Sequence, residues 1–191
     1  MIYFIGDLHL EHKNIIPYCN RPFKSVEEMN KVLIDNWSKV VKPEDTVYFL
    51  GDFSFGKFKE SIKKVNGKIV FIKGNHDRDL GNYPTLNTLT LTLDGTRFLL
   101  THDPDQLNGI FIADWLIHGH HHNNWPDKWP LINRDKHTIN VSAELINYTP
   151  ISLEDIKKLI NTSGSFNGRT SVFETENVGS TPAPEANAPI A

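Results

Sequence analysis

The chain has 191 residues, of which 39% are hydrophobic and 23% charged, the composition of an ordinary globular domain with a sizeable core. Its net charge of −3 argues against a general attraction to nucleic acid or to an anionic membrane surface. Cys19 is the single cysteine, so no intrachain disulfide forms, which fits a reducing compartment. No apolar run approaches the ~20 residues that cross a bilayer, and the first residues lack the features of a signal peptide. We therefore expect a cytoplasmic protein with no membrane partner.

The chain begins with a buried strand over residues 1–6, which runs directly into Asp7 and His9. The loop that follows, Asp7 to Lys24, is rich in polar residues and is interrupted by Pro17 and Pro22. Loops held by a rigid scaffold commonly carry binding and catalytic residues, so this loop is a candidate wall of a site.

A helix is predicted next, because Ser25 and Glu28 form a capping box at its start. Apolar residues then recur at helical spacing and make one face, namely Val26, Met29, Leu33, Trp37 and Val40. We interpret this face as core packing, and Pro43 ends the helix.

Two further strands are predicted at Thr46–Leu50 and Lys68–Lys73, with a short helix, Phe58–Val65, between them. This alternation of strand, helix and strand indicates a mixed or parallel sheet covered by helices. Leucine and threonine then alternate over residues 88–93, and Asp94–Gly95 predicts a hairpin turn into the next strand.

The last predicted elements are short. They are the returning strand of the hairpin, Arg97–Thr101, two further strands, Asp114–Ile117 and Thr138–Ser142, and a final helix from Ser152 to about Asn161. From residue 162 onward Ser, Thr, Gly, Asn, Pro and Ala dominate, and apolar periodicity disappears. We therefore expect one domain over residues 1–161 and a disordered, low-complexity tail over 162–191.

Three of the predicted strands end in glycine followed by polar residues. The first runs into Asp7, the second into Gly51–Asp52 and the third into Gly74–Asn75–His76–Asp77. Open α/β sheets bind ligands at this carboxyl edge, so these side chains predict one shared site. Imidazole and carboxylate together suit divalent metals, and two neighbouring ions need an anion between them. Asp52 is the predicted bridge, because its strand lies between the other two in sequence.

The order of these motifs is more specific than any one of them. Along the chain they run Asp7-x-His9, Gly51–Asp52, Gly74–Asn75–His76–Asp77, Thr101–His102 and Gly119–His120–His121–His122. This order resembles the calcineurin-like metallophosphoesterase superfamily, and within it the small single-domain branch with phage and bacterial members. The resemblance covers about residues 1–160 and leaves the tail outside.

The resemblance implies an α/β fold, a four-layer α/β/β/α sandwich of two mixed sheets flanked by helices, with two metal ions at the strand ends. It implies that Asp7, His9 and His122 hold the first ion and that Asn75, His102 and His120 hold the second, with Asp52 shared. The ions are expected to be Mn²⁺, with Fe²⁺, Zn²⁺ and Ni²⁺ also compatible with these ligands.

The implied activity is hydrolysis of a phosphate ester by a hydroxide that bridges the two metals, with His76 as the general acid. We expect a small phosphodiester or phosphomonoester substrate, nucleotides included, and no nucleic acid partner. The superfamily's protein phosphatases continue Gly-Asp with Arg-Gly, whereas this chain has Phe53–Ser54, so a phosphoprotein substrate is not expected.

Two residues of the first loop, His12 and Arg21, are candidates for binding the substrate phosphate, with hydrogen bonding to loop carbonyls as the alternative role. His118, His121 and His137 are not expected to be ligands. Asp77 either orients His76 or holds its loop.

Two other functions fit the sequence less well. The first is a catalytically weak protein-interaction scaffold of the same fold. Such scaffolds usually lack the catalytic histidine or several ligands, and all of these residues are present here. The second is a cysteine-based phosphatase, which needs an arginine six residues after Cys19, where this chain has Ser25.

Overall fold

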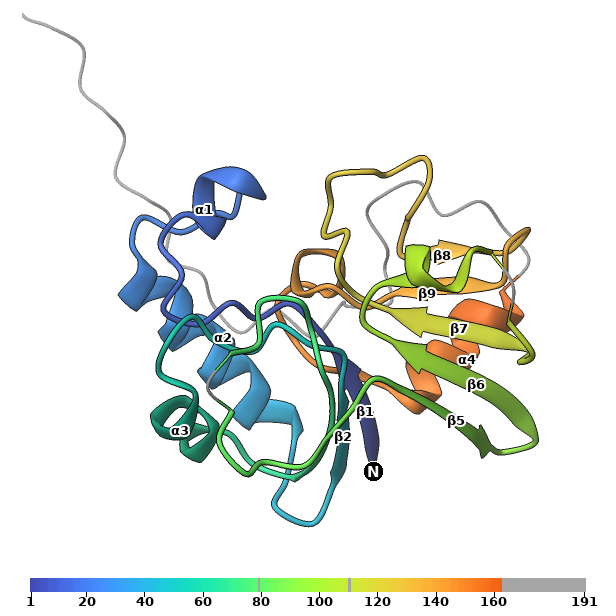
Figure 1. The fold of residues 1–191 in the computed structure, drawn as a ribbon, viewed down its shortest axis with the longest axis horizontal. Coiled ribbons are helices and arrows are strands. Elements are labelled where there is room, and N and C mark those ends of the chain that lie inside the picture. The colour runs from blue at the N-terminus through green and yellow to red at the C-terminus, as the bar shows by residue number, and fades with distance from the viewer. Residues whose placement is uncertain (79, 110, 163–191) are drawn as a thin grey trace, which may run out of the picture.

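The structure, a computed structural model, describes residues 1–78, 80–109 and 111–162, so the predicted tail lies outside the described residues. Its chain forms two five-stranded sheets (Figure 1). The first has the order β10-β1-β2-β3-β4 and consists of β1 (Ile2–Ile5), β2 (Thr46–Phe49), β3 (Lys68–Ile72), β4 (Thr85–Leu86) and β10 (Ile151–Ser152). Strands β1 to β4 are parallel, and β10 pairs with β1 in the antiparallel direction.

The second sheet has the order β5-β6-β7-β9-β8. It consists of β5 (Thr88–Leu93), β6 (Thr96–Thr101), β7 (Trp115–His118), β8 (Ile132–Asn133) and β9 (Thr138–Asn140). Strands β5 and β6 form the antiparallel hairpin predicted at Asp94–Gly95, and β6, β7 and β9 are parallel. Each sheet is therefore mixed, and each contributes parallel strands whose carboxyl ends meet at one edge.

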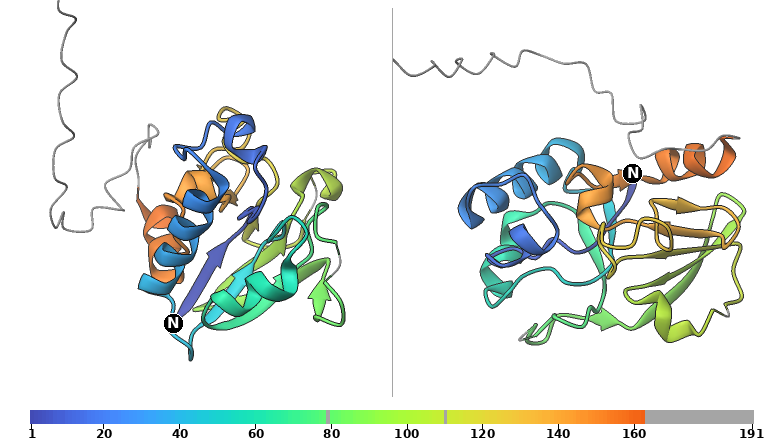
Figure 2. Two further views of the ribbon diagram at one scale, coloured as in Figure 1. Left: turned by 90° about the vertical axis from the view of Figure 1, so that its left-hand side faces the viewer. Right: turned by 90° about the horizontal axis from the view of Figure 1, so that it is seen from above.

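The described residues form four α-helices, namely α1 (Ile15–Tyr18), α2 (Val26–Val40), α3 (Phe58–Ser61) and α4 (Leu153–Asn161). A 3₁₀ turn, Ile62–Lys64, continues α3, so the predicted helix over 58–65 is two short pieces. Two more 3₁₀ turns are found at Pro104–Leu107 and Ala143–Ile146. Helices α2 and α4 lie along one side of the molecule (Figure 2).

Helix α2 begins as predicted, because the hydroxyl of Ser25 accepts a hydrogen bond from the Glu28 N–H at 3.2 Å. The carboxylate of Glu28 accepts from the Lys24 N–H at 2.7 Å, one residue before the position that a full capping box uses. The predicted apolar face turns inward, where Trp37 is fully buried and its ring lies 6.4 Å from that of Phe49 in β2. Burying such a face against a sheet is the main source of a helix's stability.

Backbone hydrogen bonds join the two sheets at their carboxyl ends. The N–H of Gly6, after β1, donates to the carbonyl of Val141, after β9, at 2.9 Å. The N–H of Asp7 donates to the carbonyl of Gly51, after β2, also at 2.9 Å. The loops that carry the predicted ligands are thereby held against one another.

The predicted fold class is confirmed: the molecule is an α/β sandwich of two mixed sheets flanked by helices. The strands that sequence patterns did not predict, β4, β8 and β10, have two residues each, too few to show a periodicity. Over the three described ranges, no helix combines the length and the apolar character needed to cross a membrane.

Candidate metal centre

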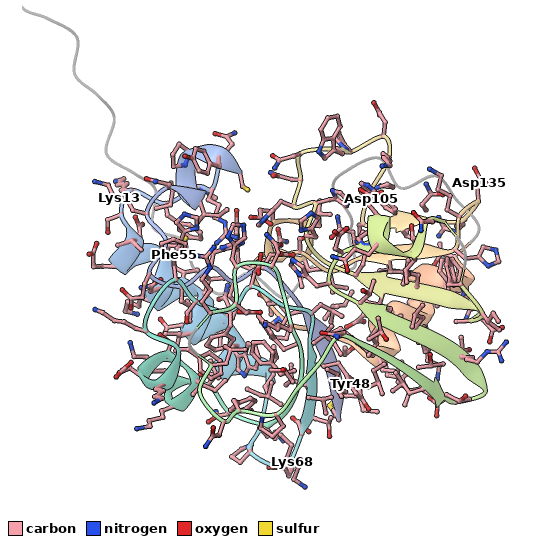
Figure 3. All side chains as sticks on the ribbon, in the orientation of Figure 1. Lys13, Tyr48, Phe55, Lys68, Asp105 and Asp135 are labelled. Carbon is pink, nitrogen blue, oxygen red and sulfur yellow. The ribbon has the colours of Figure 1, made fainter. Side chains whose placement is uncertain are left out.

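The seven predicted ligands come together at the joined strand ends. They are Asp7, His9, Asp52, Asn75, His102, His120 and His122. Nitrogen and oxygen atoms gather there, between Phe55 on one side and Asp105 on the other (Figure 3). The cluster forms because parallel strands of both sheets deliver their loops to the same edge.

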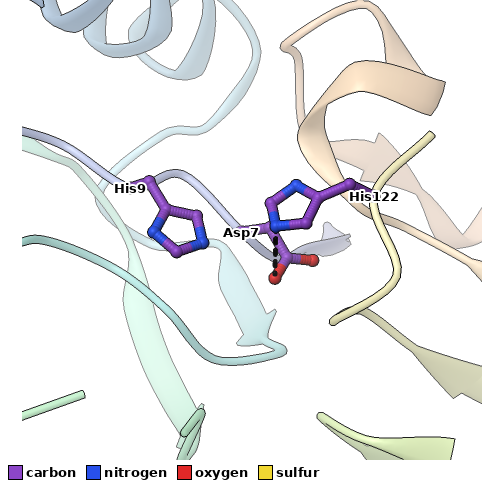
Figure 4. A group of neighbouring side chains, drawn as sticks. All are labelled: Asp7, His9 and His122. Carbon is purple, nitrogen blue, oxygen red and sulfur yellow. Dashed lines mark ion pairs between the residues drawn. The ribbon is translucent and has the colours of Figure 1, made fainter. Parts of the chain in front are cut away.

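The first group consists of Asp7, His9 and His122, whose rings and carboxylate face one another (Figure 4). Their ligand atoms lie within 4.8 Å of one another, and His122 Nε2 is 3.9 Å from Asp7 Oδ1. Asp7 Oδ1 and His9 Nε2 are both buried without a hydrogen-bond partner among the described residues. Leaving buried polar atoms unpaired costs free energy, and a cation between them removes that cost.

The second group consists of Asn75, His102 and His120. Asn75 Oδ1 lies 2.9 Å from His102 Nε2 and 3.0 Å from His120 Nδ1, and those two nitrogens are 3.2 Å apart. Around an ion with bonds of ~2.1 Å, neighbouring ligand atoms are ~3.0–3.5 Å apart. The three side chains therefore fit one divalent ion.

Asp52 lies between the two groups. Its Oδ2 is 3.5 Å from His9 Nε2 and 3.4 Å from His102 Nε2. Its Oδ1 accepts a hydrogen bond from the His76 N–H at 2.8 Å, which fixes the carboxylate and leaves Oδ2 facing both groups. This is the arrangement that a bridging ligand requires.

The backbone at the site is unusual. Five of the seven predicted ligands have positive φ angles in the left-handed region, namely Asp7 (56°), His9 (50°), Asp52 (60°), His120 (73°) and His122 (50°). This conformation costs free energy for residues other than glycine and is concentrated at functional sites. The surrounding fold therefore holds these side chains in place against a local cost.

Two glycines let the loops approach closely. A Cβ on Gly119 would lie 2.5 Å from Asp7 Oδ2, and one on Gly74 would overlap the Asp52 carboxylate. The Gly-Asn and Gly-His motifs thus need glycine at their first position, because a side chain there would collide with the carboxylate opposite.

The charges of the cluster favour cations. Burial by itself lowers the pKa of a histidine, yet Asp7 and Glu144 raise the pKa of His122 to about 11, and Asp52 and Asp7 raise that of His102 to about 9. Burial raises the pKa of Asp52, but His102 and His9 bring it down to about 2. Protons therefore occupy ring nitrogens that face a cation position, and ion binding is expected to release them.

Asp77 holds the third motif loop, which settles the alternative left open by the sequence. Its carboxylate accepts hydrogen bonds from the N–H groups of Asp52 (2.8 Å), Phe53 (2.9 Å) and Gly74 (2.8 Å). It thus fixes the loop of Asp52 against that of Asn75.

His76 is exposed, unlike most of the cluster, and its ring centre lies 5.5 Å from that of His9. Its side chain therefore borders the cluster on the solvent side. His12 lies beside His9, with the two Nδ1 atoms 3.3 Å apart, and its ring stacks on exposed Phe55 at 4.5 Å.

Arg21 does not face a substrate. Its side chain is fully buried, and its guanidinium donates to the carbonyls of Leu8 (2.8 Å) and Asp7 (2.7 Å) and to the Glu144 carboxylate (2.8 Å). Of the two roles that the sequence left open, the structure supports hydrogen bonding within the loop and not phosphate binding.

The three histidines not expected to be ligands pack on tryptophans, although the ring of His121 also lies 4.9 Å from that of His120. His118 and His121 pack on Trp129, with ring centres 4.8 and 4.9 Å from it, and His137 stacks on Trp115 at 5.0 Å. Glu144, by contrast, belongs to the site although no motif indicated it. Its Oε1 lies 3.0 Å from His122 Nδ1.

The chain is similar to several known proteins. A sequence model of the calcineurin-like phosphoesterase superfamily domain matches residues 1–142, which include all seven predicted ligands. The uncharacterized protein MJ1445 of Methanocaldococcus jannaschii is 49% identical over 164 residues, 83% of this chain and 90% of that protein. The Gene 66 protein of Mycobacterium phage L5 is 37% identical over 81 residues, 39% of each chain. The crystal structure of AQ665, a protein of unknown function from Aquifex aeolicus, has 31% identity and a TM-score of 0.67, covering 84% of this chain and 99% of that one.

Proposed function

Because the chain belongs to the calcineurin-like phosphoesterase superfamily, we propose that it is a hydrolase that cleaves a small phosphate ester with the help of two divalent metal ions. The observation that carries this proposal is the position of Asp52 Oδ2, within 3.5 Å of a ring nitrogen on each side. One carboxylate oxygen placed between two sets of ligands suits a pair of ions better than a single one.

In this proposal Asp7, His9 and His122 hold the first ion, and Asn75, His102 and His120 hold the second. Mn²⁺ is the expected metal, because imidazole, amide and carboxylate donors all bind it, and the same donors accept Fe²⁺, Zn²⁺ and Ni²⁺. When bound, the ions supply positive charge to the phosphoryl oxygens and lower the pKa of water towards neutrality.

His76 is the proposed general acid. Its exposed ring stands beside His9, while its backbone N–H is anchored to Asp52, so the side chain is free to reach the leaving oxygen of a bound ester. Donating a proton to that oxygen as the bond to phosphorus breaks removes its developing negative charge. His12, at the rim beside Phe55, is the proposed contact to the rest of the substrate.

The substrate is proposed to be a small phosphodiester or phosphomonoester, nucleotides included. The test is an assay of the purified chain with bis-p-nitrophenyl phosphate and p-nitrophenyl phosphate, each with Mn²⁺ and with EDTA. We expect turnover that EDTA abolishes and Mn²⁺ restores. A panel of cyclic, linear and diphosphate nucleotides then separates diester from monoester preference.

The result that would contradict the proposal is the absence of turnover with Mn²⁺, Fe²⁺, Zn²⁺ and Ni²⁺ while a control phosphodiesterase works in the same buffers. A chain that binds metal and a protein partner but turns over nothing would instead favour the scaffold alternative.

A further inference from the structure

A buried carboxylate lies directly behind one of the predicted ligands. Glu144 belongs to the 3₁₀ turn Ala143–Ile146, which follows β9, and its side chain is 2% exposed. Its Oε1 lies 3.0 Å from His122 Nδ1, on the side of the ring opposite Nε2. The Glu144 side chain is paired with the Arg21 guanidinium, the geometry of a carboxylate anion beside a fixed cation.

The same oxygen of Glu144 is held by Arg21. The guanidinium donates to Oε1 through Nε at 2.8 Å and approaches it through Nη2 at 2.7 Å. A buried charge of this kind needs a paired and hydrogen-bonded partner, which Arg21 and His122 supply at Oε1, whereas Oε2 has no hydrogen-bond partner among the described residues. Arg21 is in turn fixed by the carbonyls of Leu8 and Asp7, so one guanidinium supports both the Asp7 loop and Glu144.

These contacts determine which nitrogen of His122 is available. Because Nδ1–H donates to Glu144, Nε2 is left pointing toward Asp7 Oδ1, 3.9 Å away. A carboxylate behind a ligating histidine fixes its tautomer and orientation and makes the ring a stronger donor to a metal.

Glu144 itself is a support and not a ligand. Its oxygen, His122 and the thiol of Cys19 lie within 4.8 Å of one another, a spacing that an ion tolerates. The Arg21 guanidinium, however, holds Glu144 Oε1, and a cation bound at Oε2, which has no hydrogen-bond partner among the described residues, would meet the guanidinium charge at close range.

The second ion position lacks such a support. His102 Nδ1–H donates to the carbonyl of Leu50 at 2.7 Å, a neutral group that fixes the tautomer without adding charge. His120 uses Nδ1 toward Asn75, and its Nε2 is 3.9 Å from Asp103, whose side chain is 18% exposed. Asp7 Oδ1 is 4.0 Å from His102 Nδ1, beyond hydrogen-bond distance. Among the described residues, Glu144 is therefore the one buried carboxylate that is hydrogen-bonded to the back of a predicted ligand ring.

We propose that Glu144, held by Arg21, is a positioning residue that makes the Asp7–His9–His122 position bind its metal more tightly than the other. The inference rests on the proposed two-metal function and assigns the two positions unequal affinities. The charge of Glu144 acts through His122, so its loss weakens the first position and spares the second.

The test measures Mn²⁺ binding to the full chain, freed of metal with EDTA, by isothermal titration calorimetry. Glu144→Gln keeps the shape of the side chain and removes its charge. The variant is made in two backgrounds, His120→Ala, which leaves the first position intact, and His122→Ala, which leaves the second. We expect Glu144→Gln to weaken Mn²⁺ binding about 10- to 100-fold in the first background and less than about threefold in the second.

Two controls separate this role from a general effect on folding. Glu154→Gln removes a carboxylate that is 62% exposed on α4 and is expected to leave binding at both positions unchanged. Thermal melting in EDTA reports whether Glu144→Gln folds, and Glu144→Asp, which keeps the charge one methylene group further away, is expected to bind with intermediate affinity.

Equal weakening in both backgrounds, or none in the His120→Ala background, would overturn the inference. If Glu144→Gln does not fold, Glu144→Asp is measured in the same two backgrounds and judged by the same rule. A wild-type chain that binds no Mn²⁺ would instead contradict the proposed two-metal function.

Discussion

Around the first ion position, formed by Asp7, His9 and His122, each residue is at most 8% exposed. Around the second, His102 is equally buried, but Asn75 is exposed and the side chain of His120 is 30% exposed. The donor atoms are similar, yet one position is enclosed by the fold and the other opens to solvent. His76, the residue after Asn75, is exposed as well.

The backbone repeats this contrast. All three ligands of the first position have left-handed φ angles, whereas only His120 does so in the second. Such conformations persist where the surrounding structure over-determines them, and here hydrogen bonds from Arg21 and between the sheets do so. The fold therefore constrains the backbone of one ion position and leaves that of the other more adaptable.

The largest expected effect comes from removing what both positions share. Asp52→Asn should lose both ions and reduce kcat/KM by more than about 10³-fold, because a single preorganised group that stabilises charge is already worth about 10²–10³ in kcat. Metal analysis and the diester assay, run on the same preparation, measure both effects. Wild-type metal content in this variant would show that the two positions are not bridged by Asp52.

His76→Ala should separate chemistry from metal binding. We expect kcat to fall about 10²- to 10⁴-fold, the usual contribution of a positioned acid, while two ions remain bound. An ester whose leaving group needs no proton, such as a nitrophenyl ester, should be affected less than an alkyl ester. Equal losses on both kinds of ester would argue against a proton-donating role.

His122→Ala and His120→Ala compare the two positions directly. The ion that remains in His120→Ala sits in the enclosed position and should bind at least about tenfold more tightly than the ion that remains in His122→Ala. Electron paramagnetic resonance of free Mn²⁺ during titration measures both constants. The reverse order would mean that burial and carboxylate support do not decide affinity here.

Ser25→Ala is the smallest change and serves as the reference outside both positions. Removing the hydroxyl that caps α2 should cost about 1 kcal/mol of unfolding free energy. Urea unfolding in EDTA measures this loss, and Mn²⁺ affinity should stay the same. A change in Mn²⁺ affinity would show that a general loss of folding stability is enough to alter metal binding.

The sequence by itself determined the main strands, the capped helix α2 and the polar residues at each strand end. These features depend on local patterns of two to four residues, in which side-chain periodicity and capping chemistry are visible. The motif order then supplied the fold class and the predicted ligand set.

Only the tertiary structure decided what supports those ligands. Arg21 and Glu144 are 123 residues apart in sequence, and no motif around either residue predicts that they meet next to His122. Buried ionic contacts of this kind depend on how the two sheets are joined, and so do the two-residue strands β8 and β10. Pairing between distant segments leaves no periodic trace in the chain, because it is set by packing and not by local conformation.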